Sequence, residues 1–547
     1  MNADRLLAHY ERIADAPDAI ARLRRFILEL AVRGKLVPQD ASDESTSTAL
    51  RRIKAHGLLD GAFPLPASWA WIDVATVADT RLGKMLDKAK NKGLPRPYLR
   101  NINVRWFDFD LSDLLEMPFE DSELSEFTLR RGDVLICEGG EPGRAAVWDD
   151  RAQGIYFQKA IHRVRFAPLV DSVFFVYVLK ASADDGRLAE SFTGTGIKHF
   201  TGRGLNAYAV PLPPLAEQRR IVGKVDELMG LCDRLEAARG SRERMRDRLA
   251  AASIARLNAP DSETFQADAR FALDALPALT TRPDQIRQVR QTILNLAVRG
   301  KLVAQDAKDE PASDLLKRIA KEKARLVKAG EIRKSHPLPP ISKDELPFDL
   351  PGGWAWTRLG DLVHLVSGQH LQPPEYSEDP TVGLPYITGP SDFASEGLQI
   401  TRFALVRKAV AKKGQLLLTV KGSGVGKTTI CDIPEVAISR QLMALTAIEW
   451  DDRFLLLITH RLAERLREEA RSLIPGISRE DVDEFVFPLP PLAEQHRIVA
   501  TVDALMALCD RLEASLTTTA ATRRRLLDAL LAEALAPAED REREAAE

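Results

Sequence analysis

The chain has 547 residues, of which 45% are hydrophobic and 29% charged, with a formal net charge of −2. That length is too great for one hydrophobic core, so we expect three to five domain-sized units. A pI of about 6.6 excludes a generic polycation, and any nucleic-acid site must be a local basic patch. The sequence shows no apolar run of membrane-spanning length and no signal peptide, so we expect a cytoplasmic protein without a membrane partner. Four scattered cysteines fit a reducing compartment and argue against a zinc site or a disulfide framework.

The first predicted element is an amphipathic helix over residues 18–37, because Ile20, Leu23 and Ile27 recur at three- and four-residue spacing. Gly34 is a plausible C-cap glycine at its end. The heptapeptide Ala-Val-Arg-Gly-Lys-Leu-Val that contains Gly34 recurs at 297–303, and both copies are followed two residues later by Gln-Asp. The short helix is therefore predicted to be duplicated.

A first mixed domain is predicted over residues 61–213. It opens on Phe-Pro-Leu-Pro-Ala-Ser-Trp-Ala-Trp at 63–71. Short β-branched or aromatic runs at 133–136, 145–148 and 172–178 then alternate with Gly, Pro and Asp turns, which is typical of a strand-rich domain.

A second domain of the same character is predicted over residues 345–490. Its opening at 348–356 also ends in Trp-Ala-Trp, but little letter identity follows. Near-identical flanking segments around divergent domains indicate a common task for the flanks and a variable one for the domains.

A long helix is predicted behind each domain. Pro211–Gln218 (Pro-Leu-Pro-Pro-Leu-Ala-Glu-Gln) returns letter for letter as Pro488–Gln495, 277 positions later. The first helix should run from about Leu215 to Asn258, which at 1.5 Å per residue is roughly 65 Å. Each helix carries a coiled-coil seam, and the seam residues are Ile221, Val225, Leu228, Cys232 and Leu235 in the first copy and Ile498, Val502, Leu505, Cys509, Leu512 and Leu516 in the second. Two such stripes most simply bury against each other; the alternative is that each packs only on its own domain.

The predicted order is thus short helix, domain and long helix, twice. The segments are an N-terminal helical segment 1–60, a first domain 61–213, a central long helix 214–258, a second short helix with a charged linker 259–344 (317–323 helical), a second domain 345–490, a C-terminal long helix 491–536 and a disordered tail 537–547.

The segment Lys421–Thr429 resembles a phosphate-binding P-loop. The pattern requires glycine at position 421, where this chain has lysine, and it requires a following helix, where residues 429–434 resemble a strand broken by proline. Residues 132–144 align with 414–427 as strand, glycine turn and basic residue, so we predict a glycine hairpin in both copies. A P-loop-like nucleotide-binding protein remains an alternative.

No catalytic pattern accompanies these segments. The methyltransferase Asn/Asp-Pro-Pro-Tyr/Phe tetrapeptide, the Rossmann glycine pattern, His-Glu-x-x-His and Gly-x-Ser-x-Gly are absent from the sequence, and nine histidines are scattered without ligand spacing. We therefore predict no catalytic residues, no metal site and no enzymatic activity for the chain by itself.

Basic residues are concentrated in one segment of each domain. Residues 81–105 contain eight basic residues and one acid, residues 106–126 contain eight acids, and residues 401–431 contain seven basic residues and no acid. Such segments suit phosphate contacts, and Arg, Asn or Gln beside them can read base edges. The candidate DNA-binding residues are Lys84, Lys88, Lys90, Lys92, Arg96, Arg100, Asn101, Asn103, Arg144, Lys198, Arg402, Lys412, Lys413, Lys421, Ser423 and Lys427. The bland alternative is a solvated charged surface.

Taken together, these motifs resemble the specificity subunit of type I restriction-modification systems. The resemblance is carried by the repeated Pro-Leu-Pro-Pro-Leu-Ala-Glu-Gln-x-x-Ile-Val, the repeated Ala-Val-x-Gly-Lys-Leu, the Leu-Pro-x-x-Trp-x-Trp openings and the glycine-containing segments at 193–197 and 474–477. It covers nearly the whole chain. A short helical segment ahead of the first domain departs from the pattern of several relatives.

The resemblance implies an α+β protein with two mixed α/β target recognition domains, separated by two long helices packed as an antiparallel coiled coil. Each domain would read half of a split, asymmetric site in double-stranded DNA. The long helices would set the spacing and bind two methyltransferase subunits, with or without two restriction subunits. S-adenosylmethionine, ATP and Mg²⁺ would belong to those partners. The candidate partner-binding residues are Leu215, Glu217, Gln218, Ile221, Leu228, Leu235, Leu492, Glu494, Gln495, Ile498, Leu505 and Leu512. A second alternative is a coiled-coil scaffold that does not bind DNA.

Overall fold

The computed structural model describes residues 16–53, 59–87, 89, 91–258, 263–394, 397–422, 424–469 and 476–535. The predicted tail 537–547, the candidate residues Lys88, Lys90 and Ser423, and residues 474–475 of the second glycine-containing segment lie outside the described residues. No helix in the described ranges is long and apolar enough to cross a membrane.

The chain divides into two compact units. Unit 1 comprises Met1–Arg244 and Thr518–Glu547, and unit 2 comprises Met245–Thr517. Each long helix therefore contributes its first part to one unit and its last part to the other.

Unit 1 is built on a four-stranded antiparallel sheet. Its strand order is β2 (Ala78–Leu82), β10 (Ile161–Phe166), β7 (Val134–Cys137) and β8 (Ala145–Val147). A three-stranded sheet joins β6 (Leu115–Phe119), β3 (Leu94–Leu99) and β9 (Tyr156–Phe157), with β3 and β9 parallel. The pair β1 (Ala70–Asp73) and β11 (Ala209–Leu212) brings the start and the end of the domain together. The remaining elements are α4 (Thr46–Arg52), α5 (Val74–Val77), η1 (Asn101–Asn103), β4 (Val104–Arg105), β5 (Asp108–Phe109), α6 (Asp121–Phe127), η2 (Arg187–Ser191) and α8 (Gly202–Asn206).

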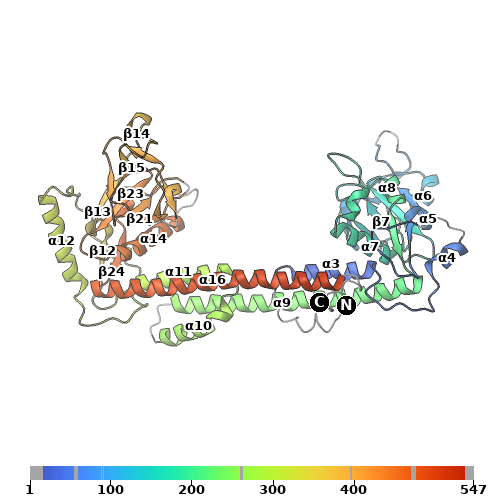
Figure 1. Cartoon of the computed structure of the whole chain (residues 1–547), viewed down its shortest axis with the longest axis horizontal. Helices are drawn as coiled ribbons and strands as arrows, with labels where there is room; N and C mark the ends of the chain where they lie inside the picture. The colour runs from blue at the N-terminus through green and yellow to red at the C-terminus, as the bar shows by residue number, and fades with distance from the viewer. Residues whose placement is uncertain are drawn as a thin grey trace. The chain divides into compact units, whose positions relative to one another are not determined.

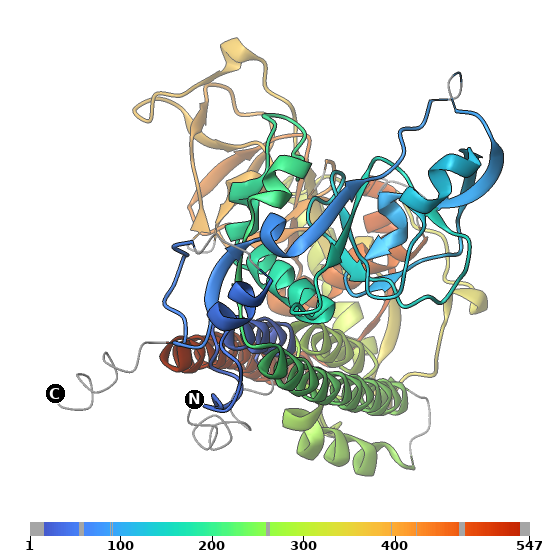
Figure 2. The same cartoon turned by 90° about the vertical axis from the view of Figure 1, so that its right-hand side faces the viewer.

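The run 172–178, expected to be extended, is helical. It forms the start of α7 (Ser172–Asp184), whose N-terminus is capped by the Asp171 carboxylate, which accepts from the backbone N–H groups of Val173 (2.9 Å) and Phe174 (3.2 Å). Phe174 through Leu179 are all buried, so the run is apolar on every side and its periodicity cannot separate strand from helix. In Figure 2, α7 lies between the strands of unit 1 and the helices α3 (Ala19–Val32) and α9 (Leu215–Asn258).

Unit 2 repeats this plan with a different second sheet. The four-stranded order is β13 (Val363–Ser367), β23 (Leu442–Ala447), β20 (Leu416–Thr419) and β21 (Thr428–Ile430), and β12 (Ala355–Arg358) pairs with β24 (Val486–Leu489). The divergent part is a five-stranded sheet of β14 (Tyr376–Ser377), β18 (Arg402–Ala404), β15 (Leu384–Ile387), β22 (Glu435–Ile438) and β19 (Val410–Lys412). Helix α14 (Asp452–Glu469) packs on the four-stranded sheet (Figure 1). Smaller elements are α13 (Leu359–Leu362), β16 (Phe393–Ala394), β17 (Gly397–Leu398), α15 (Arg479–Asp483) and the 3-10 turns η3 (Lys343–Glu345), η4 (Pro373–Glu375) and η5 (Pro390–Asp392). The duplication read from the sequence is therefore a duplication of structure.

The two short helices, α3 and α11 (Pro283–Val298), end identically. Gly34 (φ 67°) and Gly300 (φ 66°) adopt the left-handed conformation that C-cap glycines favour. A Cβ atom at Gly34 would lie 2.5 Å from Pro66, and one at Gly300 would lie 2.5 Å from Pro351. Both the backbone angle and the close contact therefore require glycine in the repeated heptapeptide.

The first long helix, α9, runs from Leu215 to Asn258, as predicted. The second long helix is α16 (Leu492–Leu535). In unit 1 the end of α16 packs on α3, which itself packs on the start of α9: Leu527 clusters with Ala19, and Arg24 pairs with Asp233 at 2.6 Å. In unit 2, α11 pairs with the start of α16 through Arg290. There the end of α9, α11 and the start of α16 line one cavity. In each unit the start of one long helix thus accompanies the end of the other, which is an antiparallel pairing.

The seam residues refine this picture. Ile221, Val225 and Cys232 are buried in the core cluster that α3, α7 and the four-stranded sheet of unit 1 share, and their counterparts are buried in the equivalent cluster of unit 2. The first part of each stripe therefore serves its own domain and short helix. The core clusters of the described residues therefore show the packing that the sequence offered as the alternative, in which each stripe is buried within its own unit.

The stretch between the halves contains a helix that the sequence did not single out. Within residues 259–284, α10 (Phe265–Leu279) is a 15-residue helix. Its residues Phe265, Ala269, Ala272 and Leu276 share one face and line a cavity with the end of α9. The charged stretch after α11 contains α12 (Ala312–Lys328), as the helical pattern at 317–323 predicts.

Candidate nucleic-acid interface

The two glycine hairpins are the same structural element, as the sequence predicts. In unit 1 the Gly143 N–H donates to Cys137 O at 2.9 Å, and in unit 2 the Gly426 N–H donates to Thr419 O at 2.8 Å. The second hairpin is followed by strand β21, so the helix N-terminus that holds phosphate in a P-loop is missing here. The nucleotide-binding alternative is therefore not favoured.

In unit 2 the hairpin meets three loops at one end of the sheet. Val420 N–H donates to Gln441 O at 2.7 Å, and Ile477 N–H donates to Val420 O at 2.8 Å. The segment that joins β15 to η5 also contacts the hairpin, because a Cβ atom at Gly424 would come within 2.4 Å of Pro390. Polar residues Arg440 and Gln441 of the β22–β23 turn thus stand beside the hairpin. Sequence reasoning missed them; their signal was a polar Ser-Arg-Gln turn between two apolar runs.

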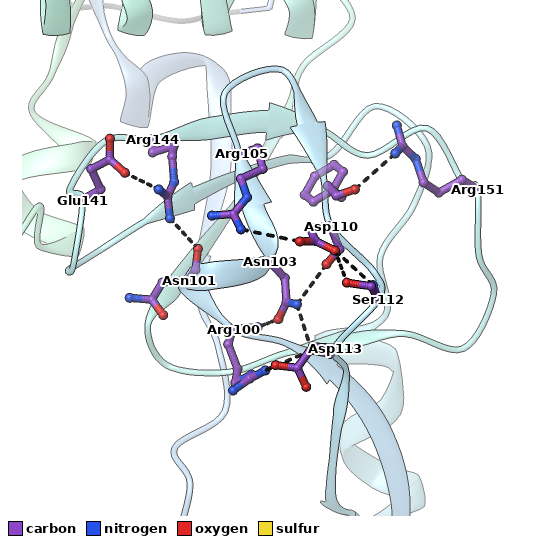
Figure 3. Close-up of polar contacts among 11 residues, drawn as sticks. Arg100, Asn101, Asn103, Arg105, Asp110, Ser112, Asp113, Glu141, Arg144 and Arg151 are labelled. Carbon is purple, nitrogen blue, oxygen red and sulfur yellow. Dashed lines mark hydrogen bonds and ion pairs between the residues drawn. The ribbon is translucent and has the colours of Figure 1, made fainter. Parts of the chain in front are cut away.

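In unit 1 the equivalent hairpin is tied to η1. Arg144 donates from Nη2 to Asn101 O at 2.8 Å, and the Asn101 amide donates to Gly139 O at 3.1 Å. Arg144 also pairs with Glu141. Figure 3 shows this arrangement, with the Asn101 side chain pointing away from the network formed by Asn103, Asp110 and Asp113.

The basic segment 81–105 is largely neutralised by the acidic segment that follows it. Arg100 pairs with Asp113 at 2.6 Å and Arg105 with Asp110 at 3.5 Å (Figure 3). Arg81 pairs with Glu126, and Arg96 lies 3.9 Å from Asp121. The local excess of positive charge counted along the sequence is therefore much smaller in the folded unit.

Two candidate residues of unit 1 are closed to a ligand. The Lys84 side chain is 9% exposed, and its ammonium donates to Glu123 at 2.5 Å and to Pro118 O at 2.9 Å. Asn103 is 2% exposed, and its amide donates to the backbone carbonyls of Asp110 and Asp113. The prediction of these two residues as DNA contacts was wrong, because their polar groups form hydrogen bonds inside the domain.

Other candidate cations remain accessible. Lys92 and Lys198 of unit 1 are exposed, and so are Lys412, Lys413, Lys421 and Lys427 of unit 2; in the described ranges none of these six is assigned an ion pair. Arg402 is partly buried, with its guanidinium 5.4 Å from the Tyr376 ring centroid. Unit 2 therefore presents four exposed lysines on the hairpin and on the turn before β20.

The repeated Glu-Gln pair has an internal task in both units. Gln218 accepts from Asp171 N–H at 2.7 Å and donates to the carbonyls of Leu169 (3.0 Å) and Pro213 (2.9 Å). Gln495 likewise accepts from Asp451 N–H at 3.1 Å and donates to Pro490 O at 2.9 Å. Because Asp171 and Asp451 stand directly before α7 and α14, these amides fix each long helix to its domain.

The neighbouring glutamates connect to the other repeated motif. Glu217 accepts from Gln39 Nε2 at 2.5 Å; Glu494 accepts from Gln305 Nε2 at 3.2 Å and from the Trp354 indole at 3.0 Å. Burial raises the pKa of both carboxyls, and these hydrogen bonds offset part of that rise. The two duplicated sequence motifs are therefore physical partners. We call these contacts the first anchor (Gln39, Glu217, Gln218, Asp171) and the second anchor (Gln305, Glu494, Gln495, Asp451).

This geometry corrects the predicted partner-binding set. Glu217, Gln218 and Ile221 are at most 1% exposed, as are their counterparts Glu494, Gln495 and Ile498, so an external subunit cannot reach them. Leu228, Leu235, Leu492, Leu505 and Leu512 pack partly buried against the core of their own unit, and Leu215 is partly buried beside a cavity. Among the residues that the structure describes, no group of three or more His, Cys, Asp or Glu could hold a metal ion.

Comparison with known proteins finds similar sequences over nearly the whole chain. The family described as "Type I restriction modification DNA specificity domain" matches residues 351–520. The type I restriction enzyme EcoAI specificity subunit of Escherichia coli is 29% identical over 93% of this chain and 93% of its own length; the EcoEI specificity subunit of the same species is 29% identical over 94% of each. Among solved structures, the HsdS subunit from Thermoanaerobacter tengcongensis is 22% identical, covers 87% of this chain and 98% of its own, and has a TM-score of 0.48. Over nearly its whole length the chain is therefore similar to specificity subunits of type I restriction enzymes, and residues 351–520 match the family model of their DNA specificity domain.

Proposed function

We propose that this chain is a non-catalytic DNA sequence-recognition subunit that reads a bipartite, asymmetric target and directs methyltransferase and restriction subunits to it. The observation that carries the proposal is the structural duplication. Two glycine hairpins end equivalent sheets, and each sheet is joined by an equivalent anchor to its own long helix. Two equivalent reading surfaces in one chain suit a target of two half-sites.

The proposal assigns separate roles to the segments of the chain. Residues 61–213 and 345–490 serve as the two target recognition domains. Among the candidate residues, the exposed lysines at positions 92, 198, 412, 413, 421 and 427 supply phosphate contacts, since their ammonium groups are accessible. Lys84 and Asn103 are excluded from this surface by their burial.

The partners are proposed from the similarity to type I restriction enzyme specificity subunits. Two methyltransferase subunits would bind the exposed faces of the long helices, with or without two restriction subunits. S-adenosylmethionine, ATP and Mg²⁺ would be bound by those subunits. The complex would act in the bacterial cytoplasm, on the nucleoid. The buried anchors are closed to such contacts, so we place these contacts on the exposed faces of α9 and α16.

Two observations argue against the alternatives. A nucleotide-binding protein needs a helix after its glycine loop, where this chain has β21. A coiled-coil scaffold without DNA gives no reason for four exposed lysines on and beside one hairpin.

Methylome sequencing of the host with and without the gene tests the function. We expect one split, adenine-methylated motif to disappear when the gene is deleted, and its persistence would contradict the proposal. Exchanging residues 345–490 with those of a relative should change one half of the motif only. A change in both halves would refute the modular account.

A further inference from the structure

The side chain of Gln441 lies beside the glycine hairpin of unit 2, and contacts within its own domain do not explain its role. A Cβ atom at Gly389 would lie 2.7 Å from Gln441 Oε1, and one at Gly422 would lie 3.5 Å from the same atom. The Gln441 amide thus lies against Gly389, where a Cβ atom would strike it, and at ordinary contact distance from Gly422. Within the described ranges, no hydrogen bond to this amide is formed, although the side chain is partly buried.

The backbone of Gln441 is fixed from both sides. Its carbonyl accepts from Val420 N–H at 2.7 Å, and its N–H donates to Ser439 Oγ at 3.1 Å. Ser439 in turn donates to Thr388 O at 2.5 Å. These hydrogen bonds hold the turn that carries the Gln441 amide, and the donor and acceptor of the amide stay available. A recognition group is preorganised in this way.

Unit 1 places a carboxamide against its own hairpin by a different route. Asn101 comes from η1, and a Cβ atom at Gly140 would lie 2.5 Å from its Nδ2. One hydrogen of the Asn101 side-chain amide is donated to Gly139 O. The backbone carbonyl of Asn101 accepts from Arg144 (Figure 3). The Asn101 Oδ1 and the second amide hydrogen remain for a ligand.

We infer that Gln441 and Asn101 are specificity-determining residues that each read an adenine in the major groove, one in each half-site. A carboxamide presents an acceptor and a donor side by side, which matches the N6 donor and N7 acceptor of adenine. In unit 2 the exposed side chains of Lys421 and Lys427 on the hairpin, and of Arg440 next to Gln441 in the sequence, suit the adjoining phosphates. The inference rests on the proposed DNA function and gives Gly389 a role, which is to leave room for this amide.

The first test uses the full chain assembled with its methyltransferase subunits. The probes are short duplexes that carry the motif from methylome sequencing. Gln441→Ala should lower the preference for adenine at one position of one half-site by about 10- to 100-fold, the range of one bidentate base contact, without changing the salt dependence of binding. Asn101→Ala should do the same in the other half-site. The matched control is Gln288→Ala, on an exposed position of α11, which should change neither half.

A second variant moves the amide without removing it. Gly389 has an extended backbone (φ 175°) that alanine can adopt, and the amide of Gln441 is the group that its Cβ atom would strike. Gly389→Ala should therefore relax the same base position as Gln441→Ala, and the double variant should be no weaker than Gln441→Ala alone. Additive losses would overturn the proposed contact between the two residues.

A base analogue identifies the atom that is read. Replacing the adenine by 7-deazaadenine removes the N7 acceptor, so wild-type binding should weaken while binding by Gln441→Ala should not weaken further. Equal losses in both proteins would overturn the inference. An unchanged motif with Gln441→Ala would overturn it too, while leaving DNA recognition intact. A complex that binds no duplex specifically would instead refute the proposed function.

Discussion

The two hairpin regions use positive charge in different ways. In unit 1, the basic segment 81–105 folds against the acidic segment 106–126, and Arg81, Arg96, Arg100 and Arg105 all face carboxylates. In unit 2, lysines at 412, 413, 421 and 427 stay exposed. Charge counted along a sequence therefore measures charge available to DNA only where no opposite charge lies beside it in the fold.

The two anchors, in contrast to the hairpin regions, are alike in the two units. Gln218 and Gln495 make matching contacts in both units, although the domains they hold share little sequence. The anchor between the domain and its long helix is therefore duplicated in structure, whereas the hairpin region of each domain differs. Substitutions at the two anchors should therefore have similar effects, whereas substitutions on the two reading surfaces should have different ones.

The largest effect is expected at the anchors. Gln218→Ala leaves Asp171 N–H and the carbonyls of Leu169 and Pro213 buried without a partner, so we expect a loss of about 2–4 kcal/mol of stability. Gln495→Ala should cost a comparable amount in unit 2. Hydrogen exchange should locate the damage at the start of α7 in the first variant and at the start of α14 in the second. Similar losses confirm equivalent anchors, and a neutral variant would show that its anchor is not structural.

The next largest effect is expected at Lys84. Its removal leaves the Pro118 carbonyl and Glu123 without their partner, but Glu123 is 30% exposed and water offsets part of the loss. We expect Lys84→Ala to destabilise unit 1 by about 2 kcal/mol and to leave the salt dependence of DNA binding unchanged. Thermal unfolding and binding titrations at several salt concentrations measure the two quantities. A reduced salt dependence with unchanged stability would restore Lys84 as a phosphate contact.

Much of this molecule follows from its sequence for identifiable reasons. Repetition exposed the long helices and both short helices, because identical letters at 211–218 and 488–495 mark the same capped helix start. Periodicity failed at 172–178, where an all-apolar run is buried on every side. The contacts at Gln441 could not be foreseen, since they join a turn to glycines 19 and 52 positions earlier, at Gly422 and Gly389, and only the folded chain brings these together.

A smaller effect is expected at the exposed lysines of unit 2. A lysine that contacts one phosphate adds about 1 to the slope of log affinity against log salt. Lys421→Ala and Lys427→Ala should each reduce that slope by about 1 and weaken binding to specific and nonspecific duplexes alike. Arg100→Ala in unit 1 is the matched comparison, because its guanidinium already pairs with Asp113 and should contribute less. Equal reductions from all three variants would erase the difference between the two hairpin regions.

The smallest effect concerns the buried glutamates of the anchors. Burial raises the pKa of Glu217 and Glu494 in the folded chain, with Arg220 paired to Asp43 and Arg497 paired to Asp309 nearby. A carboxyl with a raised folded pKa binds its proton more readily in the native state, so its contribution to stability is fully present below the unfolded pKa and declines as pH rises through the folded one. Glu217→Gln and Glu494→Gln keep an acceptor for Gln39 and Gln305 but cannot ionise. Each variant should therefore match the wild type in acid and become relatively more stable toward neutral pH, as denaturant titrations at several pH values will measure. If one variant changes this dependence and the other does not, the two anchors differ in electrostatics despite their matching hydrogen bonds.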